Sequence, residues 1–117
     1  MRVRRSFDFE AAHFLPHHPG KCRDLHGHSY HLIVTVDRAV DPATGLAIDF
    51  SELKQGVREA VIDRVDHKSL NDLLENPTAE LIAIWIWDQL VGLLDGLQEI
   101  ELFETRNCSV VYRGEPR

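Results

Sequence analysis

Residues 2–15 and 26–40 alternate between apolar and polar positions, which is the period of a strand with one buried face. In the first segment one face carries Phe7, Phe9, Ala11, His13 and Leu15. In the second segment one face carries His26, His28, Tyr30, Leu32, Val34 and Val36. A turn-rich loop at residues 16–21 lies between them. The pattern therefore predicts two strands that pair antiparallel.

Two later segments follow the 3.6-residue period of an amphipathic helix. The first runs over residues 51–65, with Asp49 or Ser51 as its N-cap. The second opens at Asn76-Pro77-Thr78, with Thr78 as the N-cap, and runs to about Leu94 with a broad apolar surface.

Residues 99–105 and 108–113 alternate again and predict two last strands joined by a turn. The element order is therefore β-β-α-α-β-β, an α+β domain with an antiparallel sheet of four strands and two helices on one face. Such a sheet has two bare edges, and pairing of these edges between identical subunits predicts a homo-oligomer.

The chain has 117 residues, which fits a single domain over residues 1–117. Its net charge of −6, from 19 acidic and 13 basic residues, argues against a general nucleic-acid binder. No run reaches the ~18 apolar residues of a membrane helix, and the start lacks an apolar signal segment. We therefore expect no membrane partner.

Two cysteines that lie 86 positions apart do not form a disulfide framework, so a reducing cytoplasm is the expected location. Cys22 would then be a free thiol, available for chemistry. Cys108 is interpreted as a small core residue, because no candidate site residue lies near it in the sequence.

The strongest chemical signal is His26-Gly27-His28, because side chains at i and i+2 of a strand share one face and can meet one metal ion. Catalytic zinc sites usually take three protein ligands and keep one open position. His13 on the partner strand is the candidate third ligand. The alternative is a half-buried strand carrying polar residues, with His13 as a hydrogen-bonded core histidine.

Five short motifs stand in a specific order. They are Phe9-Glu10-Ala11-Ala12-His13, Cys22-x-x-x-His26-Gly27-His28, Asp66-His67, Asn76-Pro77-Thr78-Ala79-Glu80 and Glu104-Thr105. In this order the chain resembles the 6-pyruvoyl-tetrahydropterin synthase superfamily from Phe7 to Tyr112. The three residues between Cys22 and His26 are similar to the branch that makes 6-carboxy-5,6,7,8-tetrahydropterin, an early step toward queuosine and other 7-deazapurines. The pyruvoyl-forming branch usually has a longer insertion there.

The resemblance implies the tunnelling fold (T-fold), in which subunits join into an oligomeric barrel and rings stack in pairs, commonly as a homohexamer that is a dimer of trimers. It implies zinc (Zn2+) bound by His13, His26 and His28, and 7,8-dihydroneopterin triphosphate as the substrate that loses triphosphate and acetaldehyde. The catalytic residues that it implies are Cys22 as the thiolate, Asp66, His67 and Glu104. It also implies Glu104 and Thr105 as substrate-binding residues, with Glu104 as the pterin anchor.

These roles agree with elementary chemistry. Zinc acts as a Lewis acid on substrate hydroxyls, and a thiolate near a cation can take a proton from carbon. A carboxylate at Glu104 can accept two hydrogen bonds from the pterin ring.

Alternatives remain at each of these residues. Asp66-His67 could cap a helix end, and Glu104 could be a surface residue. The chain could also be a sibling enzyme that forms the pyruvoyl product or cleaves the side chain of dihydroneopterin. The remaining alternative is that the chain is a non-enzymatic zinc-binding module in which Cys22 is a fourth ligand.

Overall fold

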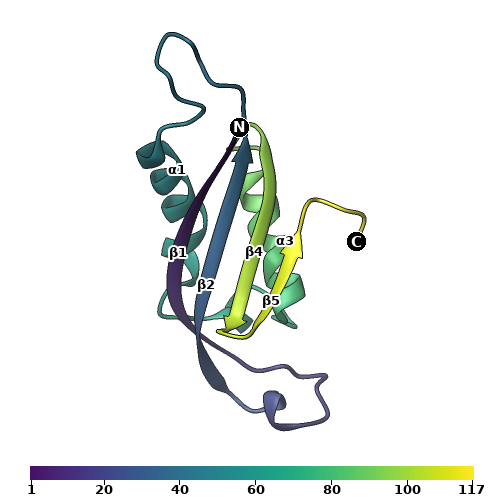
Figure 1. Ribbon diagram of the computed structural model, residues 1–117. Helices are drawn as coiled ribbons and strands as arrows, with labels where there is room; N and C mark the ends of the chain where they lie inside the picture. Colours follow the sequence, from purple (N-terminus) through teal and green to yellow (C-terminus); the bar gives the residue numbers. More distant parts are fainter.

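One five-stranded sheet runs through the computed structural model, which describes residues 1–117 (Figure 1). Its strands are β1 (Arg2–His13), β2 (His26–Asp37), β3 (Lys68–Ser69), β4 (Leu97–Thr105) and β5 (Cys108–Tyr112). The strand order is β3-β1-β2-β4-β5, and all neighbours are antiparallel except β3 and β1.

The expected sheet of four antiparallel strands is wrong at this edge. Lys68 and Ser69, for which the sequence predicted no strand, run parallel to Ala11 and Ala12 and add a fifth strand. The sheet is therefore mixed. Two residues are too short a segment to show a strand period, so alternation could not reveal β3.

The two predicted helical segments are present, but the first contains a π turn and the second ends at Leu90 rather than near Leu94. Residues 50–65 form α1 (Phe50–Val57), a wider π turn η2 (Arg58–Ile62) and α2 (Asp63–Val65). The Asp49 side chain caps α1 by accepting a hydrogen bond from the Ser51 N–H. Thr78 caps α3 (Ala79–Leu90) by accepting from the Leu81 N–H at 3.2 Å. Two short 3₁₀ turns lie between these elements, η1 (Lys21–Arg23) before β2 and η3 (Leu70–Asp72) before α3.

The core lies between one face of the sheet and the helices (Figure 1). The strand residues predicted to share a face are buried there, namely Phe7, Phe9, Ala11, Tyr30, Leu32, Val34, Val36, Ile100 and Leu102. The helices contribute Leu53, Val57, Val61, Ile82, Ile86 and Leu90. The other face of the sheet is not covered by either helical segment. None of the helices combines the length and the apolar character needed to cross a membrane.

Cys108 is exposed, so its interpretation as a core residue is wrong. It is the first residue of β5, which is the edge strand of the sheet. An edge position next to a tight turn has a neighbouring strand on one side only, and this explains the exposure.

Candidate metal centre and adjoining cavities

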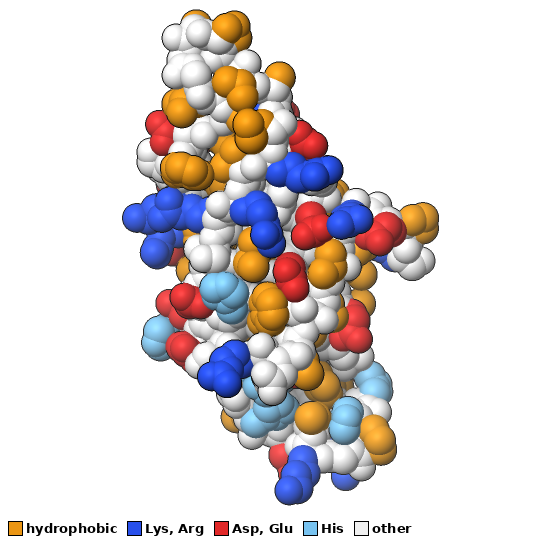
Figure 2. Space-filling model, viewed as in Figure 1, with side chains coloured by type: hydrophobic (Ala, Val, Ile, Leu, Met, Phe, Trp, Pro, Cys, Tyr) orange, Lys and Arg blue, Asp and Glu red, His pale blue; other side chains and the backbone are white.

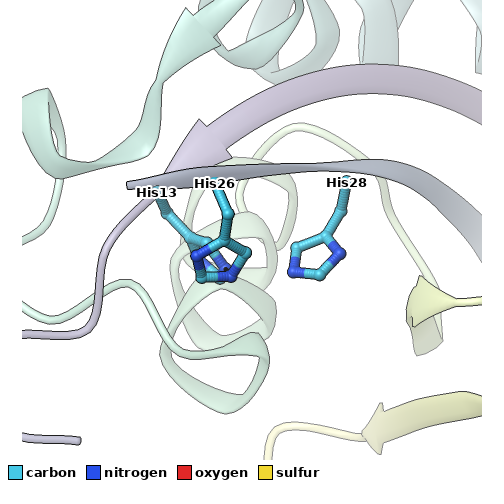
Figure 3. A group of neighbouring side chains, drawn as sticks. All are labelled: His13, His26 and His28. Carbon is cyan, nitrogen blue, oxygen red and sulfur yellow. Dashed lines mark hydrogen bonds between the residues drawn. The ribbon is translucent and has the colours of Figure 1, made fainter. Parts of the chain in front are cut away.

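Three histidine rings meet where β1 ends and β2 begins. The strand register places His13 opposite His26 and Ala11 opposite His28, so both β2 histidines lie beside the end of β1. Figure 3 shows His13 and His26 close together, with His28 next to them along β2. One ligand atom from each of the three histidines lies within 4.8 Å of the others. The structure thus brings together the residues that the sequence singled out.

The hydrogen bonds of two of these rings fix which nitrogen carries the proton. His13 Nδ1 lies 2.8 Å from the carbonyl oxygen of Pro77, and His26 Nδ1 lies 2.7 Å from that of Asp24. A carbonyl can only accept, so both Nδ1 atoms are protonated donors and both Nε2 atoms present lone pairs. These bonds orient the rings as outer-shell carbonyls do around metal-binding histidines.

The inward-facing nitrogens of His13 and His26 face each other, and that of His28 has no partner in the chain. His13 Nε2 and His26 Nε2 are 3.0 Å apart, and two lone pairs at that distance repel unless a cation lies between them. His28 Nε2 is buried and has no hydrogen-bond partner. Three converging imidazole nitrogens suit a divalent metal of the zinc type. The cluster is therefore consistent with a metal site.

Burial favours the neutral form of the central histidine. His13 is fully buried, and burial is the main cause that lowers its pKa, while the Pro77 carbonyl and Glu104 act in the opposite direction. Neutral imidazole is the form that binds metals. The Tyr30 hydroxyl lies 3.3 Å from His13 Nδ1, and burial raises the pKa of Tyr30, so this hydroxyl stays protonated beside the cluster.

Glu104 adds a carboxylate to the same place. It follows Phe103, which is the last β4 residue paired with β2, and its oxygens lie 3.7 Å from His28 Nε2 and 3.9 Å from His13 Nε2. A cavity of about 630 Å³ opens where the strands separate, lined by His28, Glu104, Thr105 and Arg106 among others. Glu104 therefore lies beside the histidine cluster and at the wall of this cavity.

The pair Asp66-His67 is held against β1. Asp66 Oδ1 accepts from the Glu10 N–H at 3.0 Å, and the His67 N–H donates to the Glu10 carbonyl at 2.6 Å. Asp66 Oδ1 also lies 3.0 Å from His67 Nδ1. The Glu10 N–H, followed by His67, lowers the pKa of Asp66, so the carboxylate is ionised and orients the ring.

The position of His67 agrees in part with the helix-cap alternative, because Asp66 is the C-cap of α2. His67 itself has a φ of 59°, a left-handed conformation that costs energy for a non-glycine residue. His67 also lines a second cavity of about 470 Å³ together with Gly27 and His28. The pair therefore shares a cavity with one histidine of the cluster.

Cys22 is not part of either arrangement within the chain. It lies in η1, half-buried, in the connection between β1 and β2. The three-histidine cluster does not include it, and it does not line the two cavities described above.

Sequence reasoning missed the carbonyls of Pro77 and Asp24. Every residue has a carbonyl, so residue identity carries no signal for such a contact.

The comparisons with known proteins agree with this geometry. A family model described as 6-pyruvoyl tetrahydropterin synthase matches residues 2–115. The 6-carboxy-5,6,7,8-tetrahydropterin synthase of Synechocystis sp. (strain ATCC 27184 / PCC 6803 / Kazusa) is 44% identical over 117 residues, which cover 94% of this chain and 91% of that protein. The 6-pyruvoyl tetrahydrobiopterin synthase of Dictyostelium discoideum is 45% identical over 102 residues, which cover 82% and 76%.

A solved structure of Caenorhabditis elegans 6-pyruvoyl tetrahydropterin synthase superposes with a TM-score of 0.90 at 27% identity. The match covers 98% of this chain and 96% of that one. The five-stranded mixed sheet with its two helical segments is thus the fold of this solved relative.

Proposed function

Because the chain belongs to the 6-pyruvoyl tetrahydropterin synthase family, we propose that it is a zinc-dependent carbon–carbon lyase that makes 6-carboxy-5,6,7,8-tetrahydropterin. Its substrate is 7,8-dihydroneopterin triphosphate, and the reaction releases triphosphate and acetaldehyde. The product enters the biosynthesis of queuosine and other 7-deazapurines.

The share of each relative that the match covers, together with the short spacing between Cys22 and His26, favours this product. Identity does not separate the two named activities, because the values are 44% and 45%. The match to the carboxy-forming relative, however, extends over 91% of that protein, against 76% for the pyruvoyl-forming one. Only three residues separate Cys22 from His26, and this short spacing also favours the carboxy-forming branch.

Zinc fits the three-histidine cluster, and we assign His13, His26 and His28 as its ligands. The paired Nε2 lone pairs and the orphaned nitrogen of His28 support the assignment. When bound, zinc would supply a Lewis acid that makes the C–H and O–H groups of the substrate side chain more acidic.

The remaining roles fall to residues of the chain itself. Glu104, next to the histidines, accepts hydrogen bonds from the 2-amino and N3 groups of the pterin, and Thr105 lines the same cavity. The family resemblance assigns proton abstraction from carbon to the Cys22 thiolate, although Cys22 does not line these cavities within one chain. His67, oriented through Nδ1 by Asp66, keeps its other ring nitrogen free to pass a proton.

The alternatives are weaker on specific grounds. A closed zinc module needs Cys22 as a fourth ligand, but the cluster of ligand atoms consists of histidines only. The pyruvoyl-forming activity and the side-chain cleavage of dihydroneopterin use the same fold. Product identity decides between them and the carboxy-forming activity.

We also propose a homohexamer, built as a dimer of trimers that closes into a barrel, in the cytoplasm. The edge strand β5 is unpaired on its outer side within one chain, which supports edge pairing between subunits (Figure 1). Sedimentation analysis of the purified protein tests this state. A monomer at micromolar concentration would contradict it.

The activity is tested by incubating the zinc-loaded protein with 7,8-dihydroneopterin triphosphate and identifying the products by mass. We expect the 6-carboxy product together with acetaldehyde and triphosphate. Cys22→Ala should give no product, whereas the matched control Cys108→Ala, at the exposed cysteine, should retain full turnover. A 6-pyruvoyl product would refute the assignment to the carboxy-forming branch.

A further inference from the structure

A second hollow lies on the uncovered face of the sheet, far from the histidines. It has a volume of about 380 Å³ and is lined by Arg2, Arg4, Thr35, Gln98, Glu99 and Arg113. Thr35 lies seven residues beyond His28 on β2, which corresponds to about 24 Å along the strand. Figure 2 looks onto this face and shows Lys and Arg side chains, with Asp and Glu side chains among them, across the strands.

The hollow is built by a row of residues that crosses four strands. Thr35 on β2 stands opposite Arg4 on β1 and opposite Glu99 on β4. Arg113, directly after β5, extends the row by bonding Glu99 through Nε and an Nη atom at 2.9 and 2.8 Å. The positions of the side chains thus follow from strand register.

Thr35 is the unusual member of this row. It lies on the uncovered face, yet only 3% of it is exposed, because its cross-strand neighbours Arg4 and Glu99 have long side chains. Its hydroxyl has no hydrogen-bond partner. A buried hydroxyl without a partner is unfavourable, so this group at the floor of the hollow can gain by bonding a ligand.

Two of the three arginines are also short of partners. The carboxylates nearest to Arg2 and Arg4, Asp37 and Glu101, lie 3.9 and 4.0 Å away, beyond hydrogen-bond reach. Neither guanidinium donates a hydrogen bond within the chain, although each offers five N–H donors. Each of the three arginines has one carboxylate within 4.0 Å, but only Arg113 is hydrogen-bonded to its partner, so the donors of Arg2 and Arg4 remain available to a ligand.

We propose that this hollow is a binding site for a small polyphosphate anion. Arg2 and Arg4 bind the phosphate oxygens, and Thr35 donates from below. Guanidinium groups match phosphate geometry through paired N–H donors. The volume is at the small end of ligand pockets and exceeds the need of a single phosphate, so a diphosphate or triphosphate group is the better fit. The proposal is independent of the catalytic assignment above.

The test is calorimetric titration of the protein with inorganic triphosphate, pyrophosphate and orthophosphate at low ionic strength. We expect triphosphate to bind most tightly. Arg4→Gln and Arg2→Gln should each bind it about 10- to 100-fold more weakly, since each loses a charge-assisted contact. The matched control is Arg64→Gln on α2, an arginine on the helical side of the sheet, which should bind as the unchanged protein does. Titration with a nucleoside triphosphate distinguishes a nucleotide from free polyphosphate.

Thr35→Val keeps the shape of the side chain and removes only the hydroxyl. It should weaken triphosphate binding by about 2- to 10-fold while the free protein remains fully folded. The titration is repeated in His28→Ala, where the metal site is disrupted but this hollow is intact. Retained binding there separates the hollow from the histidine cluster. Undiminished affinity in Arg4→Gln or Thr35→Val, or an equal loss in Arg64→Gln, would overturn the proposal.

Discussion

Replacing His28 by Ala should abolish the stabilisation that zinc confers on the folded protein. His28 Nε2 is one of three nitrogens that converge within 4.8 Å, and it is buried without a partner. The substitution removes one ligand and leaves only the His13 and His26 pair. Two imidazoles hold zinc far more weakly than three, so the affinity falls although the fold stays in place.

The size of the effect follows from linkage. A ligand that binds only the folded state stabilises it by about 2.7 kcal/mol when its free concentration is 100 times the dissociation constant. For a chain of 117 residues, 1 kcal/mol shifts the unfolding midpoint by roughly 4 °C. Zinc should therefore raise the midpoint of the unchanged protein by about 10 °C. The same zinc concentration should shift His28→Ala by no more than about 2 °C.

The assay is thermal unfolding followed by circular dichroism on chelator-stripped protein, with and without added zinc. Metal analysis of the same samples provides the occupancy. His31→Ala is the matched control, because His31 lies on the same strand but on the opposite face, where it pairs with Asp8 at 2.6 Å. It should keep the full zinc response. An undiminished zinc response or full occupancy in His28→Ala would refute the three-histidine site.

Three further predictions address the neighbouring groups. Cys22→Ala should retain zinc and lose turnover, as shown by metal analysis and product assays, whereas loss of both would indicate a metal ligand. Glu104→Gln should weaken pterin binding by about 2–5 kcal/mol at unchanged zinc content, and unaltered calorimetric affinity would place the ring elsewhere. In zinc-free protein the pKa of His13 is lower in the folded state than in the unfolded state. As the pH drops below 6.5, His13 is therefore protonated more readily in the unfolded chain, and the free energy of unfolding should fall. Urea titrations at several pH values should show a smaller fall in His13→Gln, and an equal fall would contradict this origin.

Local patterns in the sequence were sufficient to predict most helices and strands and part of the candidate site. Alternation in a strand assigns each side chain to a face, so His26 and His28 were expected to lie together, and they do. Capping depends on a few consecutive residues, and the N-cap at Thr78 is where the sequence predicted it. The order of the motifs also identified the family, which the match to residues 2–115 confirms.

Tertiary structure decided which of these faces and ends meet. The carbonyl that orients His13 belongs to Pro77, 64 positions away, and Glu104 reaches the cluster from a different strand. The parallel pairing of β3, the exposure of Cys108 and the unpaired hydroxyl of Thr35 likewise depend on neighbours that are distant in sequence. A periodic pattern shows that a side chain faces inward but does not specify its partner. That partner is determined by strand register and helix packing, which form only when the whole chain folds.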